Sequence, residues 1–356
     1  MRKLNFLMAF LFILAPFLIS GQDQAVKAIT AVNVQSLGPQ KLGNLPPVIA
    51  PVNNPQSTLK IQLGKQLYFD TRLSKDNTIS CATCHDPAMG WSDVGPTSTG
   101  INGQKGGRRA PPVSNAVYAP LQFWDGRAPT LEEQAKGPVA NPIEMGNTHE
   151  EMLRTVQDIP GYVTEFEKVF GTSDVSVDLV AEAIAAFERT VVTTDSPFDR
   201  YARGDDQALT PLEKQGLEIF NGKGHCTACH WGGYFSDGRF HNLGVQPTDP
   251  AKPDLGRYVI TKDTTDMGAF KTPTIRDVAL RAPYMHNGSE KTLEDVVDLY
   301  DKGGRTGDPN LSPLIVPLGL TKGEKKALIA FMTTAMTSIN PEVADVKPIP
   351  ASELPK

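Results

Sequence analysis

Apolar residues recur along the chain at the spacing of one face of an α-helix. In 177–190 they form a stripe with the 3.6-residue helical repeat: Leu179, Val180, Ala183, Ile184 and Phe187. Three other segments begin with a Thr-x-x-Glu or Thr-x-x-Asp pattern, which caps the first turn of a helix, at Thr210, Thr292 and Thr321. The pattern predicts a mostly α-helical fold.

The stretches between these helices contain many helix breakers. Residues 22–56 and 341–356 are rich in proline and aperiodic, which predicts an extended N-terminal arm and a C-terminal tail. The polar stretch 195–207 predicts a linker between two domains. Gly (31 residues) and Pro (29 residues) exceed their usual shares of about 7% and about 5%. We therefore expect a loop-rich chain.

The first 21 residues have the organisation of a signal peptide. Arg2 and Lys3 precede an apolar run at 4–19, and small and polar residues follow it. The alternative is an uncleaved membrane anchor, but the run is shorter than the ~20 residues that span a bilayer, and it contains Pro16. We expect export to the periplasm with removal of residues 1–21.

Composition and charge exclude several classes of protein. Of the 356 residues, 40% are apolar and 21% are charged, as in ordinary globular domains, which excludes long disordered regions, collagen and a multi-span membrane protein. The formal net charge is −5, and it becomes −7 without Arg2 and Lys3. An acidic protein binds polyanions poorly, so we expect no nucleic-acid partner.

The four cysteines form two CxxCH motifs with none left over: Cys81-Ala82-Thr83-Cys84-His85 and Cys226-Thr227-Ala228-Cys229-His230. Four cysteines in an exported protein usually indicate disulfides, and CxxC pairs also occur in thioredoxin-like and zinc sites. None of these sites needs a histidine after each pair. In c-type cytochromes, two thioethers attach the porphyrin and the next histidine binds the iron. The motifs predict two covalently bound haem c groups, with His85 and His230 as iron ligands.

The two motifs lie 145 residues apart and have similar upstream flanks. Gly64-Lys65-Gln66-Leu67-Tyr68-Phe69 precedes the first motif, and Gly216-Leu217-Glu218-Ile219-Phe220 precedes the second. Each flank reads as a short helix that leads into the haem motif. We expect two cytochrome-c-like haem domains, at 57–200 and 201–340, that arose by internal duplication.

Several short motifs follow in order along the chain, in register with the two haem sites: Gln104-Lys105-Gly106, Phe123-Trp124-Asp125-Gly126-Arg127, Gln134, Pro138, Asn141-Pro142-Ile143-Glu144-Met145-Gly146, Phe240-His241-Asn242-Leu243-Gly244 and Ala282-Pro283-Tyr284-Met285-His286-Asn287-Gly288. With these motifs, residues 57–340 resemble the bacterial di-haem cytochrome c peroxidase family, which includes MauG. The resemblance implies a peroxidatic haem in the N-terminal domain and an electron-transfer haem in the C-terminal domain.

The resemblance implies that Glu144 is the catalytic acid–base. Splitting peroxide requires a group that takes a proton from one oxygen and returns it to the other. A carboxylate in a dry pocket can do both when burial raises its pKa. The family residues that match Gln134 and Pro138 shape the pocket around this glutamate. From the residues alone, a solvated side chain in a loop is the more common role for such a glutamate.

Trp124 has two interpretations. A single tryptophan is more often a packing residue than an electron conduit. In the family, the tryptophan that matches Trp124 lies between the haems and carries electrons. The resemblance therefore implies electron transfer through Trp124.

Two residues depart from the common family pattern. Many members carry a histidine ligand sixteen residues after the first haem histidine, where this chain has Ile101, which cannot bind iron. We expect the peroxidatic haem to be open at rest, as in MauG. Members with a methionine ligand on the second haem place it where this chain has Tyr300, again as in MauG. The resemblance favours Tyr300 as that ligand, with Met285 or Met267 as the alternatives.

A third departure concerns calcium, which many members bind between the haems. Counting back from Trp124, the asparagine ligand of those members corresponds to Arg109, which cannot ligate calcium but could place its own cation there. The other family ligands are backbone carbonyls, here at Arg281 and Pro283. Calcium therefore stays an open alternative to the arginine.

The sequence leaves three functional hypotheses. The first is a cytochrome-c peroxidase (EC 1.11.1.5) that reduces hydrogen peroxide with electrons from a soluble cytochrome c or cupredoxin. The second is a MauG-like enzyme that uses a bis-ferryl state to oxidise residues of a partner protein; Ile101 and Tyr300 favour it, whereas Gly224 stands where MauG has a surface tryptophan. The third is a non-enzymatic electron carrier, which would leave Glu144 and Gln134 without a purpose. The resemblance also makes a homodimer the candidate assembly.

Overall fold

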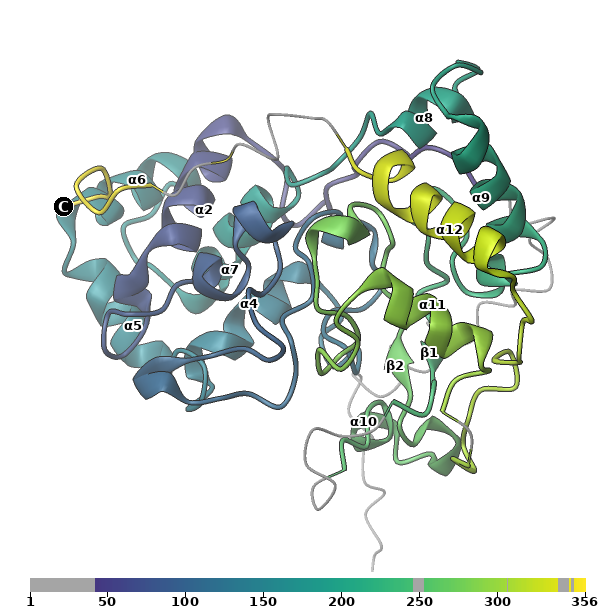
Figure 1. The fold of residues 1–356 in the computed structure, drawn as a ribbon. Helices are drawn as coiled ribbons and strands as arrows, with labels where there is room; N and C mark the ends of the chain where they lie inside the picture. Colours follow the sequence, from purple (N-terminus) through teal and green to yellow (C-terminus); the bar gives the residue numbers. More distant parts are fainter. Residues whose placement is uncertain (1–41, 246–252, 306, 339–345, 347–348) are drawn as a thin grey trace, which may run out of the picture. The chain divides into compact units, whose positions relative to one another are not determined.

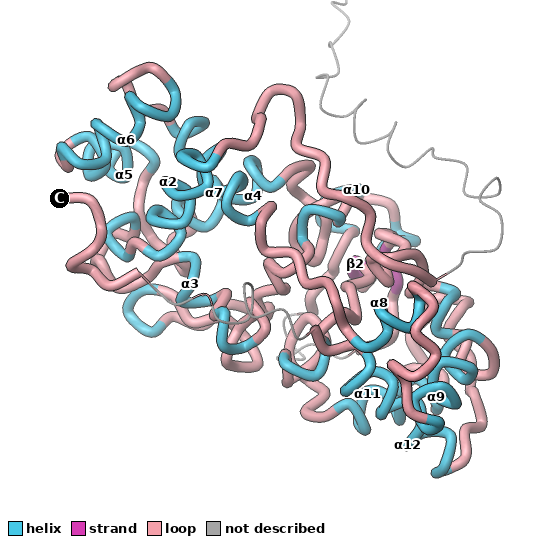
Figure 2. Tube along the Cα trace, turned by 90° about the horizontal axis from the view of Figure 1, so that it is seen from above, coloured by secondary structure: helices cyan, strands magenta, loops and turns pink. Residues whose placement is uncertain are grey.

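The computed structural model describes residues 42–245, 253–305, 307–338, 346 and 349–356. The expected signal peptide at 1–21 and the first part of the expected arm lie outside these residues. The described chain is mostly helical, with long loops between the helices, as Figures 1 and 2 show. This confirms the mostly α-helical, loop-rich part of the predicted fold class. Among the described residues, no helix has the length and apolar composition needed to cross a bilayer.

The regular elements follow one another along the chain. The helices are α2 (Thr58–Phe69), α3 (Cys81–Cys84), α4 (Leu131–Ala140), α5 (His149–Gln157), α6 (Pro160–Phe170), α7 (Val177–Glu188), α8 (Pro197–Ala202), α9 (Pro211–Asn221), α10 (Tyr258–Thr261), α11 (Leu293–Asp301) and α12 (Lys322–Ala330), the last continued by a π-turn at Phe331–Ala335. Two short strands, β1 (Phe240–His241) and β2 (Phe270–Lys271), pair antiparallel, with Phe240 opposite Lys271 and His241 opposite Phe270. Single 3-10 turns occur at Thr71–Leu73, Pro87–Met89, Ile101–Gly103, Ala116–Tyr118, Cys226–Ala228, Thr264–Asp266 and Val278–Leu280.

The helix starts that the sequence predicts are present. Thr210, Thr292 and Thr321 each accept a hydrogen bond from the backbone N–H three residues later, and the acidic side chain at that position binds back to the threonine N–H. These reciprocal bonds satisfy backbone donors that a helix N-terminus otherwise leaves unpaired. The predicted helix at 177–190 is α7.

The stretch 195–207, predicted as a linker between domains, contains the helix α8. Ser196 and Asp199 form a capping box with Pro197 in the first turn, and Phe198 is buried. The Asp199 carboxylate accepts two hydrogen bonds of 2.8 and 2.9 Å from Arg276. This polar segment is thus held by a buried ion pair with a residue 77 positions away.

Hydrophobic side chains gather in two main clusters. The first joins buried residues between Leu63 and Val191, and the second joins buried residues between Phe198 and Met336. In each cluster the helix before a CxxCH motif packs on a later helix, α2 on α7 and α9 on α12 (Figure 1). The described end of the chain returns to the first cluster, where Val346 and Ile349 pack.

A glycine makes each helix crossing close. A Cβ atom at Gly64 would lie 1.8 Å from the Ala183 carbonyl oxygen, and one at Gly216 would lie 2.1 Å from the Ala327 carbonyl oxygen. No side chain fits at that separation. The absence of a side chain therefore sets how closely these helices approach, and with them the position of the haem motif that follows.

We expect Gly64→Ala and Gly216→Ala each to destabilise the holo-protein by about 1–3 kcal/mol or more, because the added methyl group must push two helix backbones apart. Gly323→Ala is the matched control, since a Cβ atom at this glycine of α12 would meet nothing within 4 Å. Thermal unfolding followed by circular dichroism measures the effect. Equal unfolding temperatures for the two buried variants and the control would contradict the close-packing account.

Candidate functional site

The first CxxCH motif opens onto a cavity of about 550 Å³. The turn at α3 is held by Ser80 and Thr83, which cap each other's backbone N–H groups. Helix α4, the loop after it and the end of α7 close the other sides. The lining includes the candidate attachment and pocket residues Cys81, Cys84, His85, Gln134, Pro138 and Glu144. The structure thus brings the sequence-predicted residues of the first site together.

The second CxxCH motif opens onto a smaller cavity of about 190 Å³. Helix α11, the end of α12 and the segment 268–275 surround it. The lining includes Cys226, Cys229, His230, Tyr300, Met285 and Trp124.

The four cysteines are unpaired thiols within the described chain. Burial raises the pKa of Cys81, and it raises that of Cys84 to about 11 and that of Cys226 to about 12. Redox-active and zinc-binding cysteines have lowered pKa values, because the thiolate is the reactive form. Neutral thiols at cavity walls fit thioether attachment of a porphyrin instead.

The two histidines have the protonation state that iron requires. Burial lowers the pKa of both rings, which favours neutral imidazole. The His230 Nδ1 atom lies 3.0 Å from the Phe235 carbonyl oxygen, so that Nδ1 carries the proton and Nε2 is the free ligand atom. The Tyr68 hydroxyl donates to the carbonyl of His85 at 3.1 Å.

A buried lysine supports the fit of a haem in the second cavity. Lys271 is 8% exposed and lines this cavity. Burial lowers its pKa to about 8, and no charged side chain of the described residues offsets this effect. A buried ammonium group without a counter-charge is costly. The carboxylates of a haem would supply such a charge, so the residues present fit this group.

Glu144 lies at the first cavity with the other predicted pocket residues. Burial raises its pKa, although Arg127 and the hydrogen bond from Asn141 oppose that shift. The Asn141 amide donates to Glu144 Oε1 at 2.8 Å and so fixes the carboxyl group. Backbone bonds of 3.3 and 3.2 Å from Asn141 and Met145 to the Pro138 carbonyl hold this loop against the end of α4.

Ile101 lies beside this loop and away from the cavity lining. Its side chain is 5% exposed, and its backbone N–H donates to the Glu144 carbonyl at 2.9 Å. A Cβ atom on Gly146 would lie 2.1 Å from Ile101 Cδ1, so the two residues are in close contact. The apolar residue at the position of the family histidine therefore anchors the Glu144 loop.

Trp124 lines both cavities. Its Nε1–H donates to the Arg109 carbonyl at 2.8 Å, and its own carbonyl accepts from the Lys271 N–H at 2.8 Å. Its ring centre lies 6.5 Å from that of His286, which stacks on Phe270 with a centre separation of 3.6 Å. The indole is thus fixed on both sides at a wall shared by the two cavities.

Two of the three candidate ligands for the second haem line its cavity. Tyr300 and Met285 are part of the lining, whereas Met267 is not. Burial raises the pKa of Tyr300. The free side chain is therefore a neutral phenol, and only a strong positive charge such as ferric iron would stabilise its ionised form.

Arg109 directs its guanidinium group into a set of backbone carbonyls. It donates to the carbonyls of Asp93 and Gly95, and to that of Ala282 at 3.2 Å. The contacted carbonyl is that of Ala282, between the two expected family ligands Arg281 and Pro283. The backbone N–H of Arg109 also donates to the His286 carbonyl at 2.7 Å.

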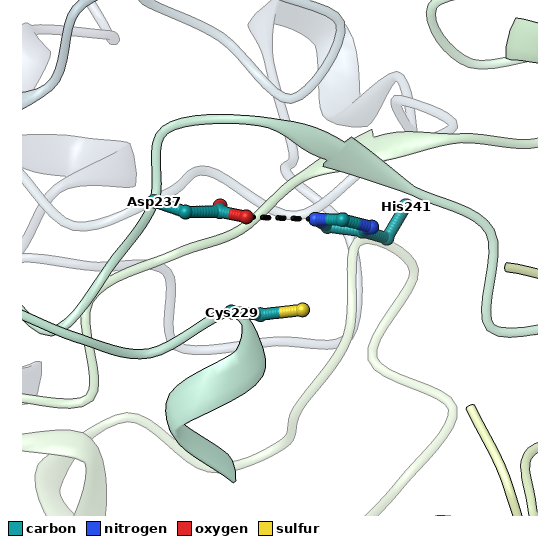
Figure 3. Close-up of side chains that lie close together, drawn as sticks. All are labelled: Cys229, Asp237 and His241. Atoms are coloured by element: carbon teal, nitrogen blue, oxygen red, sulfur yellow. Dashed lines mark hydrogen bonds and ion pairs between the residues drawn. The ribbon is translucent and has the colours of Figure 1, made fainter. Parts of the chain in front are cut away.

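Cys229, Asp237 and His241 gather at the second haem motif, as Figure 3 shows. Their ligand atoms lie within 4.8 Å of one another, close enough in principle to share a metal ion. Burial opposes a charge on His241, but the hydrogen bond from its ring to Asp237, 2.9 Å long, and the nearby Cys229 raise its pKa to about 9. Because the CxxCH motif assigns Cys229 to haem attachment, we interpret the arrangement as a His–Asp pair beside this motif and not as a metal site.

Sequence reasoning missed two buried ionisable residues of these cavities, Glu188 and Lys271. Glu188 lines the first cavity and Lys271 the second. A signal for Glu188 existed, because it lies one helical turn after Ile184 on the apolar α7 stripe. No comparable signal marked Lys271.

Comparisons with known proteins agree with this geometry. The family model described as "Di-haem cytochrome c peroxidase" matches residues 58–207. Cytochrome-c peroxidase IdrP1 of Pseudomonas sp. (strain SCT) is 38% identical over 92% of this chain and 94% of its own length. Methylamine utilization protein MauG of Methylorubrum extorquens is 40% identical over 80% of each chain.

A solved structure extends the comparison to the fold. The crystal structure of a MauG-like protein associated with microbial copper homeostasis superposes with a TM-score of 0.76 and 34% identity. The match covers 87% of this chain and 96% of that one. Sequence, fold and the two CxxCH cavities agree, and the chain belongs to the di-haem cytochrome c peroxidase family.

Proposed function

We propose that the protein is an exported, periplasmic di-haem peroxidase that reduces hydrogen peroxide to water with electrons from a small cytochrome c or cupredoxin. One observation carries this proposal: Glu144 lies in the first haem cavity with a raised pKa, on a loop held by Ile101. Haem iron bound at His85 would supply the site at which peroxide accepts electrons. The relatives named as cytochrome c peroxidases support this activity.

Glu144 provides the proton transfers that peroxide cleavage requires. Its carboxylate accepts a proton from one oxygen of hydrogen peroxide and returns it to the other oxygen, which leaves as water when the O–O bond breaks. Asn141 orients the carboxyl group through its 2.8 Å hydrogen bond. Gln134 and Pro138 form the wall of α4 beside it and restrict the space available to the substrate. Trp124, at the shared wall, is the proposed route for electrons from the second haem.

A MauG-like reaction on a partner protein is the second candidate. It is favoured by the position of Tyr300 in the second cavity and by the buried Ile101 at the place of the family histidine. The relative named MauG and the MauG-like crystal structure add support. Gly224 in place of a surface tryptophan speaks against it, because that position would carry oxidising equivalents to a partner.

We propose that the chain is organised as two haem domains. We infer that the haem domains at 57–200 and 201–340 arose by duplication, supported by the matching α2–α7 and α9–α12 crossings, each with its glycine. The boundary falls within α8, whose Phe198 packs with the second cluster. We also infer that the Arg109 guanidinium takes the place of calcium among the carbonyls that it contacts. A homodimer stays a prediction of the family resemblance.

Glu144→Gln should slow peroxide reduction by about 10²–10⁴-fold while both haem spectra stay unchanged, because the amide cannot accept the proton. In the wild type, the rate should fall as the pH drops through the raised pKa of Glu144, since the ionised form is the base. This pH dependence should disappear in the variant. Stopped-flow mixing with peroxide across a pH series measures both effects.

Glu133→Gln is the matched control, because this α4 glutamate is 49% exposed and pairs with Lys136. It should react like the wild type at every pH. An unchanged rate in Glu144→Gln would mean that Glu144 is not the acid–base, and the proposed activity would lose its main support.

Tyr300→Met should raise the reduction potential of the haem at His230, because a thioether stabilises ferrous iron whereas a phenolate stabilises ferric iron. Spectroelectrochemical titration of the holo-protein measures the shift, and Met285→Leu should leave the wild-type potential unchanged. A high positive wild-type potential with a methionine–iron charge-transfer band that Met285→Leu abolishes would identify Met285 as the ligand. The MauG-like candidate would then lose its strongest support.

A further inference from the structure

A second carboxyl group lies in the first haem cavity, apart from the Glu144 loop. Glu188 is the last residue of α7, is 4% exposed and lines the cavity together with Cys81 and Gln134. Its Oε2 atom has no hydrogen-bond partner among the described residues. An unpaired buried polar atom is rare in proteins and normally has a partner that the protein chain does not supply. The cavity that Glu188 lines is the space from which such a partner would reach Oε2.

Glu188 forms no ion pair with the other described residues. Arg189 follows it in the chain, but its Nη2 pairs with Glu132 Oε1 of α4 at 2.5 Å and its Nη1 has no hydrogen-bond partner among the described residues. Glu132 itself adds negative charge and raises the pKa of Glu188 further. From α2 and α3, Tyr68 and Cys81 face the carboxyl group, and burial raises the pKa of both, so both side chains stay neutral beside it.

The two protonation states of Glu188 are therefore close in free energy near neutral pH. Burial is the largest cause and raises its pKa to about 8, with the charge of Arg189 acting in the opposite direction. A group poised in this way responds to any nearby change of charge. The charge that changes in this cavity is that of the haem attached at Cys81 and Cys84. Oxidised iron favours the carboxylate, and reduced iron favours the protonated acid.

We propose that Glu188 is a proton-binding site coupled to the oxidation state of the haem attached at Cys81 and Cys84. It takes up one proton when this haem gains an electron and releases it when the haem is oxidised again. The inference deepens the proposed function: reduction of one hydrogen peroxide to two waters consumes two electrons and two protons. Glu188 holds one of these protons inside the cavity, separately from the transfer performed by Glu144.

The sign of the coupling follows from the charges. Because reduction makes the carboxylate less favourable, the pKa of Glu188 is higher with the reduced haem than with the oxidised haem. Between these two pKa values each electron brings one proton, and the reduction potential falls as the pH rises. A tenfold drop in proton concentration then makes reduction tenfold less favourable, which is 59 mV for a one-electron couple.

The test is the reduction potential of the haem at His85, measured spectroelectrochemically in the holo-protein across pH values on both sides of 8, near the pKa of Glu188. In the wild type, the equilibrium constant for reduction of this haem should fall by nearly tenfold for each unit of rising pH. In Glu188→Gln the reduction potential should change little with pH. The haem of this variant should be easier to reduce at high pH than that of the wild type, because the negative charge of Glu188 is missing. Asp178→Asn is the matched control, because it removes a carboxylate of α7 that is 72% exposed, and should keep the wild-type slope.

Two further measurements keep the outcome clear. Glu188→Asp should retain a pH-dependent potential, which distinguishes loss of a proton site from loss of structure. The redox-difference infrared spectrum of the wild type should contain the band of a carboxyl group that becomes protonated on reduction. Equal slopes in the wild type and Glu188→Gln, or a wild-type spectrum without such a band, would overturn the proposal. A Glu188-dependent slope in a protein that does not reduce peroxide would overturn the proposed function and leave this proton site standing.

Discussion

The cost of placing charge in a buried, apolar cavity governs the chemistry of this protein. Burial favours the neutral form of His85 and His230, the form that can bind iron, and it keeps the thiols of Cys81, Cys84 and Cys226 protonated. The same cost raises the pKa values of Glu144, Glu188 and Tyr300. A carboxyl group that can hold or release a proton near neutral pH follows directly from this effect. Burial thus acts on all of these side chains, and the residues around each one determine what it can do.

Those partners come from separate parts of the chain, and close helix packing fixes their positions. Gly64 and Gly216 let α2 and α9 approach the backbones of α7 and α12. The first crossing also places the end of α7, and hence Glu188, on the wall of the cavity that α3 opens. Arg109 and Trp124 then join the segments around both cavities through backbone carbonyls. The proposed routes for protons and for electrons thus depend on the same packed helices and loops.

The local features could be predicted from sequence because short-range rules determine them. Helix caps at Thr210, Thr292 and Thr321 depend on side chains three residues apart, and haem attachment depends on a five-residue motif. Other features need contacts between distant residues. Helix α8 carries the same short-range signal, Ser196 with Asp199 and Pro197 in the first turn, but the polar composition of 195–207 masked it. Only the buried partner of Asp199, Arg276, lies far along the chain. Likewise, the burial of Glu188 and the carbonyl contacts of Arg109 depend on how separate segments pack.

The central claim is that the first haem cavity is open and holds a working acid–base before any reduction. The most direct test is steady-state turnover of hydrogen peroxide by the holo-protein with a reduced small cytochrome c, with and without prior reduction of the enzyme. The account predicts immediate turnover from the fully oxidised enzyme, with two cytochrome molecules oxidised for each peroxide, because Ile101 cannot close the site. Turnover that begins only after reduction would contradict the open cavity, and no turnover under either condition would contradict the peroxidase itself.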